Sequence, residues 1–445
     1  MNATILGKYL ISSALDAPHT GWGVRIDGNL IREIGPNDVL RSKYGDDVVL
    51  DATDKVIMPG FVNPHMHMFS ALAQGMPGIA PCGEVIEWLM AHWWARIEDK
   101  TDAEMIRAGT ALCAALMIRN GITTVCDVME TPYALPGCLD TAGQEMDRSG
   151  MRSVLTFEAT ERVSAENGQL GLEENECFIR QNPPGQGRLS GMICTHTTFT
   201  CSLPFLKQAR RLADQLGSGL RMHTAESSYE PAYCLRTYGM LPFEVYDNIG
   251  FLQSDVLASL AIHVKEREVV LAARRGVKIA HIPRASANPG CGVAPVPSFL
   301  AQGMTVGLST YPSFNPFETM RATQLIHRAH WIDGSLLPAK QLLEMTTSGA
   351  ARAIGLANLG QLKTGFLADL ILVDGNFPQP VTEKNLIDLI VSQRDPAHVD
   401  TVIVNGEMLM RQGRLLTLDL EQVKEEALAS SRELWRRNGF SLELT

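Results

Sequence analysis

Residues 55–67 read KVIMPGFVNPHMH, an apolar strand-like run that leads through a Pro-Gly pair into two histidines. Side chains along an extended strand alternate between its two faces, so His65 and His67 project to the same side. Two neutral imidazoles that converge at a strand end supply half of the ligands of a transition-metal site. Taken alone, such a pair is more often one histidine that caps a loop and one that packs. The rest of the chain decides in favour of the metal site.

The composition limits the classes of protein that the chain can belong to. Its 445 residues are 45% hydrophobic, enough for one large core and a smaller module. The formal net charge of −10 argues against nucleic-acid and anionic-membrane partners, because both require a basic face. Nine cysteines without a Cys-x-x-Cys pair indicate reduced thiols rather than disulfides. No basic segment followed by a long apolar stretch opens the sequence, so we expect a soluble, cytoplasmic protein.

The two ends of the chain share a β-rich character that the interior lacks. Short strand-like runs separated by Gly, Asp and Pro turns occupy residues 1–57, and similar runs recur at 368–374, 399–406 and 408–411. A charged, helical pattern follows at 421–437. These patterns predict one composite β-sandwich domain, with a C-terminal helix, built from residues 1–57 and 358–445.

The interior, residues 58–357, alternates strands with amphipathic helices such as 103–119, 204–216 and 265–275. Eight such alternations predict an α/β fold, a (β/α)₈ TIM-like barrel with its catalytic groups at the carboxyl ends of the strands. The strand candidates are 55–67, 122–128, 152–160, 192–199, 220–225, 256–263, 277–283 and 305–311. The histidines at or near their ends are His65, His67, His196, His223, His263 and His281. Packing alone does not readily explain histidines at so many strand ends.

The segment His223-Thr224-Ala225-Glu226 adds a third imidazole and a carboxylate. A hydrolytic metal site needs neutral nitrogen ligands and a nearby carboxylate that moves protons from water to the leaving group. His223 at a strand end and Glu226 in the following loop supply one of each. His263 closes the next strand candidate and would be a fourth imidazole, although it is also suited to capping the next helix.

At this point the chain resembles the amidohydrolase superfamily, and within it the branch of chlorohydrolases, guanine deaminases and S-adenosylhomocysteine deaminases. The motifs that carry the resemblance are PGFVNPHMH (59–67), EWL (87–89), GITTV (121–125), HTTFTCS (196–202), HTAE (223–226) and GVAPV (292–296). Two end segments, TGFLADLILVD (364–374) and VDTVIVNG (399–406), resemble the composite β domain of that branch. The resemblance therefore covers nearly the whole chain.

The resemblance implies one divalent metal ion, zinc or alternatively Fe²⁺, held by the His-x-His pair, a histidine of the fifth strand and an aspartate of the eighth. By position the histidines correspond to His65, His67 and His223. Glu226 then corresponds to the proton shuttle, and His263 to the group that polarises the substrate or the water.

The chain departs from the family in the eighth strand. The family has Gly-Thr-Asp-Gly there, whereas this chain has Ser309-Thr310-Tyr311-Pro312, which places Tyr311 at the position of the metal-binding aspartate. A phenol with an ordinary pKa near 10 cannot act as a base at neutral pH unless the metal ionises it. Three histidines and water still complete a tetrahedral zinc site. Some triazine hydrolases of the branch are similar in having a threonine in place of this aspartate. Thr310 could correspond to that threonine only if the strand slipped by one residue, because neighbouring side chains point to opposite faces.

Residues of the substrate pocket are less clearly marked. His196 resembles a substrate-contacting histidine of the family. Trp88, Trp93, Trp94 and Phe69 could stack on a flat heterocycle, although helix packing is the better explanation for at least two of them. Arg284 could bind an anionic or carbonyl group, and a surface ion pair would suit it as well.

These observations predict a metal-dependent hydrolase of the deaminase or chlorohydrolase type. It would act on a C–N or C–halogen bond at an amidine-like or aryl carbon of a small nitrogen heterocycle, through attack of a metal-bound hydroxide. Ring-opening hydrolysis of a cyclic amide or imidazolone is an alternative. A catalytically silent ligand-binding relative is another, because Tyr311 replaces the aspartate. The resemblance also implies a homo-oligomer, a dimer or larger, with neither nucleic acid nor membrane as a partner.

Overall fold

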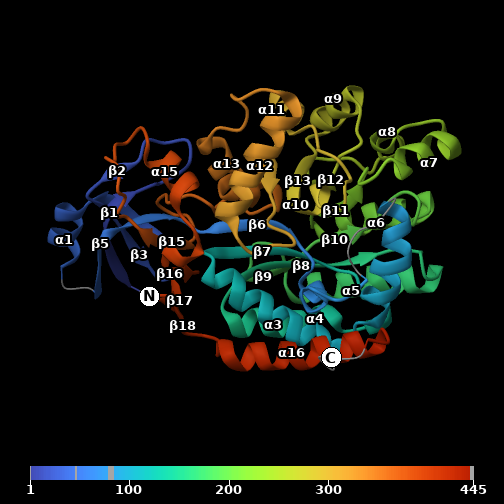
Figure 1. The fold of residues 1–445 in the computed structure, drawn as a ribbon, viewed down its shortest axis with the longest axis horizontal. Coiled ribbons are helices and arrows are strands. Elements are labelled where there is room, and N and C mark those ends of the chain that lie inside the picture. The colour runs from blue at the N-terminus through green and yellow to red at the C-terminus, as the bar shows by residue number, and fades with distance from the viewer. Residues whose placement is uncertain (1, 46–47, 79–84, 441–445) are drawn as a thin grey trace.

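The computed structural model describes residues 2–45, 48–78 and 85–440, which form two β-sheets and the helices around them. Figure 1 shows a central barrel surrounded by helices, and beside it a second sheet in which segments from both ends of the chain lie together. The predicted TIM-like barrel with an additional β module is therefore confirmed.

The barrel sheet is parallel and nearly closed, with the order β14-β13-β12-β11-β10-β8-β7-β6 and β9 paired to β8. Its strands are β6 (Phe61–Met66), β7 (Ile122–Met129), β8 (Arg152–Ala159), β9 (Leu189–Gly191), β10 (Ile193–Thr195), β11 (Leu220–Thr224), β12 (Val256–Leu260), β13 (Lys278–His281) and β14 (Val306–Leu308). The first and last strands of this order, β6 and β14, are joined near their ends by hydrogen bonds that involve side chains. Ser309 Oγ donates to the carbonyl of His65 at 2.7 Å, and the amide of Thr310 donates to Asn63 Oδ1 at 3.2 Å.

The second sheet has the order β18-β17-β16-β15-β5-β1-β3-β4, with β2 paired to β1. Its strands are β1 (Ala3–Leu10), β2 (His19–Thr20), β3 (Trp22–Asp27), β4 (Leu30–Pro36), β5 (Val48–Pro59), β15 (Leu370–Asp374), β16 (Val399–Val404), β17 (Glu407–Arg411) and β18 (Arg414–Leu415). The central pairing of β5 with β1 and β15 joins the early and late parts of the chain. The assignment of this sheet to one domain of residues 1–57 and 358–445 remains a prediction.

The expected strand 55–67 is divided between the two sheets at Gly60. A Cβ atom at Gly60 would lie 2.2 Å from the side chain of Thr123, so only glycine fits at this crossing. A buried ion pair also joins the two sheets, because Arg152 on β8 donates to both carboxylate oxygens of Asp369, at 2.8 and 3.1 Å.

The barrel helices begin and end where local sequence signals predict. Asp102 caps α3 (Ala103–Arg119), Ser202 caps α6 (Leu203–Leu216), and Gly217 ends α6 in the left-handed conformation. The other α-helices around the barrel are α2 (Val85–Trp88), α4 (Cys138–Ser149), α5 (Ala165–Gln181), α7 (Tyr229–Tyr238), α8 (Pro242–Asn248), α9 (Glu266–Arg275), α10 (Pro283–Ala287), α11 (Val296–Ala301), α12 (Pro316–Trp331), α13 (Ala339–Thr346) and α14 (Ser348–Ala353). The shorter turns are η1 (Met68–Ala73), the π-helical η2 (Leu89–Trp94), η3 (Glu98–Lys100) and η4 (Pro132–Ala134).

The remaining helices are α1 (Asn37–Tyr44), α15 (Leu386–Gln393) and α16 (Leu420–Arg437), together with the 3₁₀ turn η5 (Pro396–His398). Helix α16 runs along the barrel beside α3 (Figure 1). Its Trp435 donates to the carbonyl of Leu72 at 3.3 Å, and Arg437 forms an ion pair with Asp102 at 2.5 Å. Helix α16 therefore supports the segment that directly follows His67. Among the described residues, none of the helices is long and apolar enough to cross a bilayer.

Candidate metal centre and active site

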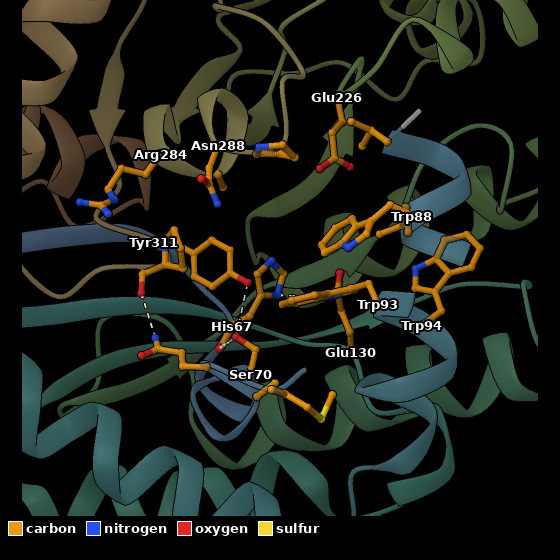
Figure 2. A pocket seen from close by; sticks show the side chains of 18 of the residues that line it. His67, Ser70, Trp88, Trp93, Trp94, Glu130, Glu226, Arg284, Asn288 and Tyr311 are labelled. Atoms are coloured by element: carbon orange, nitrogen blue, oxygen red, sulfur yellow. Dashed lines mark hydrogen bonds and ion pairs between the residues drawn. The ribbon is translucent and has the colours of Figure 1, made fainter. Parts of the chain in front are cut away.

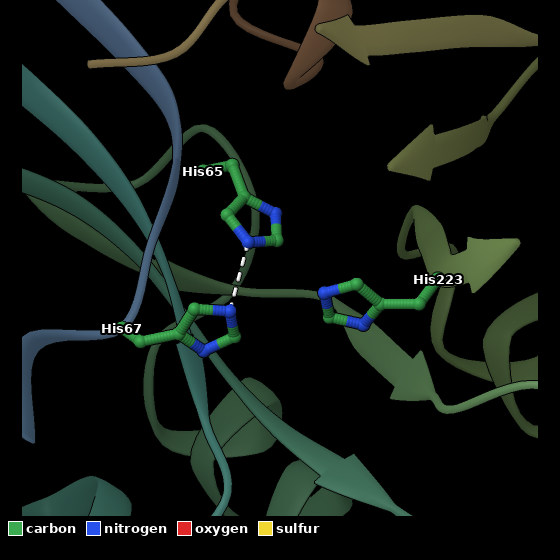
Figure 3. A group of neighbouring side chains, drawn as sticks. All are labelled: His65, His67 and His223. Carbon is green, nitrogen blue, oxygen red and sulfur yellow. Dashed lines mark hydrogen bonds between the residues drawn. The ribbon is translucent and has the colours of Figure 1, made fainter. Parts of the chain in front are cut away.

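Three histidines from two strands meet inside the barrel (Figure 3). His65 lies in β6 with His67 directly after it, and His223 lies in β11. One ring nitrogen of each lies within 4.8 Å of the others, and the Nε2 atoms of His65 and His67 are 2.9 Å apart. The structure thus brings together the three histidines expected to bind metal.

The Nδ1 atoms of two of the three imidazoles make hydrogen bonds that suit metal binding through Nε2. His67 Nδ1 donates to the carbonyl of Val128 at 2.9 Å, and His223 Nδ1 donates to Glu158 Oε1 at 2.9 Å. Each bond fixes the tautomer that leaves the Nε2 lone pair free for a ligand. His65 differs, because its Nδ1 accepts a hydrogen bond from Arg221 Nη2 at 2.7 Å and lies 3.1 Å from Ser259 Oγ.

Burial keeps the three imidazoles in the neutral form that binds cations. It lowers the pKa of His65 and His67 well below the usual value, and it lowers the pKa of His223 to about 3. Three neutral, converging imidazoles, two of them with the tautomer fixed for ligation through Nε2, fit a divalent metal ion, and tetrahedral zinc in particular.

Tyr311 follows β14 and contacts this group. Its ring centroid lies 4.9 Å from that of His67, and its hydroxyl lies 3.4 Å from Ser70 Oγ. Burial raises the pKa of the Tyr311 phenol, so at neutral pH it is a hydrogen-bond donor and not a base. The position expected for the aspartate therefore carries a protonated group.

Glu226 lies in the loop after β11 and faces the main cavity (Figure 2). Burial, and then the nearby charge of Glu230, raise the pKa of Glu226 to about 7. Glu230 also accepts hydrogen bonds from the amides of Ala225 at 2.5 Å and Thr198 at 2.9 Å. It thereby holds the turn in which Ala225 has a φ of +50° and from which Glu226 projects.

The main cavity has a volume of about 550 Å³ and opens above the histidines (Figure 2). Most of the residues expected at the site line it: His67, Trp88, His196, His223, Glu226, Arg284 and Tyr311, together with Trp93 and Trp94. His196 is buried, with its Nδ1 2.6 Å from Thr200 Oγ1. Arg284 also forms an ion pair with Glu318 at 2.6 Å. Its position therefore allows both a contact with a ligand in the cavity and the ion pair that the sequence suggested as an alternative.

The structure does not bring His263 into this group. Strand β12 ends at Leu260, where left-handed φ values of +74° at Leu260 and +47° at Ala261 turn the chain. His263 lies beyond that turn, and its Nε2 is 2.7 Å from the carbonyl of Cys291. His281 is buried against the ring of His327, with a centroid separation of 5.0 Å.

Three glutamates near the histidines, Glu98 and Glu158 buried and Glu130 largely so, were not predicted from the sequence. Glu158 Oε1, besides accepting from His223, lies 3.7 Å from His196 Nε2, and Glu130 Oε2 lies 3.3 Å from His67 Nδ1. Glu98 accepts from Arg162 at 2.7 Å. Glu158 is the last residue but one of β8 and Glu130 directly follows β7, so both could have been predicted, like the histidines, from their places at strand ends.

Comparison with known proteins identifies the family. Residues 56–409 match the model of the amidohydrolase family, and the chain belongs to this family. It is 32% identical to a 5-methylthioadenosine/S-adenosylhomocysteine deaminase of Pelotomaculum thermopropionicum, over 95% of this chain and 96% of the relative. It is also 32% identical to a 5'-deoxyadenosine deaminase of Methanosarcina mazei, over 97% and 98% of the two chains.

Solved structures agree in fold. A zinc-bound adenosine deaminase from Xanthomonas campestris superposes with a TM-score of 0.86 at 22% identity, covering 98% of this chain and 99% of that one. The atrazine chlorohydrolase of Arthrobacter aurescens, complexed with zinc, gives 0.84 at 21% identity, covering 96% and 100%. The predicted resemblance is confirmed, as is the expectation of an enzyme that hydrolyses carbon–nitrogen bonds other than peptide bonds. The comparisons do not support the catalytically silent alternative.

Proposed function

We propose that this protein is a zinc-dependent deaminase of a small amino-substituted nitrogen heterocycle. The observation that carries the proposal is the convergence of His65, His67 and His223 beneath a cavity that also contains Glu226. The similarity to deaminases over almost the whole chain supports the same reaction class. When bound, a zinc ion would supply Lewis-acid chemistry and make water acidic enough to be a nucleophile near neutral pH.

Glu226 is suited to move the protons of the reaction. A carboxyl group with a pKa of about 7 gives and takes protons with similar ease near neutral pH. An amine must be protonated before it leaves, whereas a halide leaves as the anion. A proton donor of this kind therefore favours C–N over C–halogen cleavage.

The other cavity residues bind and orient the heterocycle. Trp88 and Trp93, 5.5 Å apart, offer aromatic faces for a flat ring. Tyr311 would donate a hydrogen bond from its retained proton, and His196, with Nδ1 held by Thr200, can contact the substrate through its ring. We assign no role at the heterocycle to His263, because its Nε2 contacts the carbonyl of Cys291 and the side chain is not among those that line the main cavity.

Product analysis with the zinc-loaded protein tests the proposal. A panel of aminopurines, aminopterins, aminotriazines, chlorotriazines and cyclic ureas would be assayed for ammonia, chloride and product mass. We expect ammonia release, and we expect Glu226→Gln to lower turnover about 10²- to 10⁴-fold at unchanged zinc content. Glu173→Gln, the same change on an exposed glutamate, is the matched control.

Each other outcome contradicts a part of the proposal. Addition of water without ammonia would favour ring opening, chloride without ammonia would favour the chlorohydrolase reaction, and full turnover by Glu226→Gln would remove that residue from the chemistry. Homo-oligomeric assembly and a cytoplasmic location remain predictions from the sequence.

A further inference from the structure

A second large cavity lies where the strands of the barrel begin. Its lining includes Ser190 of β9, Gly219 and Asp255 directly before β11 and β12, and Lys278, the first residue of β13. We call this space the amino-end cavity. His223 lies near the carboxyl end of β11, whereas Gly219 precedes the first residue of that strand. The amino-end cavity and the main cavity therefore belong to opposite ends of the barrel.

The amino-end cavity is large enough for a small molecule. Its volume is about 450 Å³, within the range of roughly 300–1,000 Å³ that is usual for ligand pockets. Gly185, Gly217 and Gly355 line it without side chains, and a Cβ atom at each would meet nothing within 4 Å. A ligand with an aliphatic body suits the walls, because buried apolar side chains form part of them: Val154, Met192, Ala213, Ala353 and Ile354.

Four charged side chains line the amino-end cavity, and three of them are paired with one another. Arg210 donates to both carboxylate oxygens of Asp255, at 2.9 and 2.7 Å, and forms an ion pair with Asp214 at 2.7 Å. The fourth is Lys278, whose ammonium group forms neither a hydrogen bond nor an ion pair with any residue that the structure describes. Lys278 is therefore the charged group of this lining that has no partner.

The protein compensates the burial of Lys278 only in part. The side chain is half-buried, and this desolvation lowers the pKa of Lys278 below its ordinary value, although the charge of Asp255 acts in the opposite direction. Both carboxylate oxygens of Asp255 already accept from Arg210, so Asp255 is committed to another partner. A partly desolvated ammonium group without an acceptor is stabilised by a ligand that brings one.

We propose that the amino-end cavity binds a small aliphatic carboxylic acid, with its carboxylate on Lys278 and its chain against the apolar part of the wall. A carboxylate carries one negative charge, which matches the one unpaired ammonium group, and it accepts charge-assisted hydrogen bonds. A phosphate with two negative charges would bring its second charge close to Asp214 and Asp255, and like charges side by side are unfavourable. This site goes beyond the proposed function, because none of its lining residues lines the main cavity.

Binding of hexanoate and hexanamide, which share the chain and differ in the head group, tests the site. Both would be titrated into the zinc-loaded protein by calorimetry. We expect hexanoate to bind about 10-fold more tightly, because a charge-assisted hydrogen bond in a half-buried site is stronger than a neutral one. Lys278→Met should abolish this preference at unchanged zinc content. Lys207→Met, the same change on an exposed lysine of α6, is the matched control and should retain it.

Protection from acetylation is a second measurement, and it needs no variant. Saturating hexanoate should slow the modification of Lys278 by acetic anhydride, measured by peptide mass spectrometry, and should leave that of Lys207 unchanged. The site would be overturned by absent hexanoate binding, by equal affinities for the two probes, or by a Lys278 that hexanoate does not protect. A preference that survives Lys278→Met would also overturn it and would place the carboxylate on another cation, such as Arg284 in the main cavity. Displacement of hexanoate by inorganic phosphate at equal concentration would contradict the choice of a carboxylate.

Discussion

Replacing Glu158 by alanine would test how the protein holds its metal. Glu158 accepts the Nδ1 proton of His223 at 2.9 Å, and both side chains are buried. The alanine variant leaves this donor without an acceptor, which costs about 1–3 kcal/mol. Loss of such a hydrogen-bond partner typically weakens metal binding about 10- to 100-fold, which corresponds to about 1.4–2.8 kcal/mol.

The assay is competition for zinc between the protein and a chelator of known affinity. We expect Glu158→Ala to weaken zinc binding about 100-fold. We expect Glu158→Gln, which keeps an oxygen acceptor but cannot ionise, to weaken it about 10-fold. Glu173→Gln controls for the loss of an exposed carboxylate elsewhere. Wild-type zinc affinity in the alanine variant would refute the reasoning, because it would mean that Glu158 does not orient His223 for the metal.

Three further predictions follow from the same geometry. Glu230→Gln removes a like charge that raises the pKa of Glu226, so the limb of the pH–rate profile that reports Glu226 should move to lower pH; an upward shift contradicts this. Asp369→Ala leaves the buried guanidinium of Arg152 without its carboxylate and should lower the free energy of unfolding by about 3–5 kcal/mol in urea titrations. Zinc binds the folded state, so chelation should lower the thermal midpoint reversibly, with no such response in His67→Ala.

Much of the fold could be predicted from the sequence because its signals are local. The helix expected at 103–119 is observed as Ala103–Arg119, and the one expected at 421–437 as Leu420–Arg437, since capping residues mark their ends. Strand ends were less predictable. The division of 55–67 at Gly60 depends on which distant strands pair with each half. Because the residues on both sides of Gly60 are apolar, the sequence does not show that the chain passes there from one sheet to the other.

The candidate site was easiest to predict where its residues are close together in sequence. The pair His65 and His67 and the segment from His223 to Glu226 have short spacings with a chemical meaning, and the structure brings them together. Glu98 lies far from Glu158 along the chain, and only the barrel brings both to one recess. The placement of His263 was not foreseeable, because left-handed turns at ordinary residues such as Leu260 leave no sequence signal.

The contact of helix α16 with the carbonyl of Leu72 has a consequence for biosynthesis. His65 and His67 are synthesised early, whereas helix α16, which supports the turn that follows them, is synthesised only after the whole barrel. During synthesis, the turn that contains Leu72 therefore lacks the contact with α16 until this last helix has been made. Ion loading should accordingly follow translation of α16, and a nascent chain arrested before this helix should retain the ion poorly.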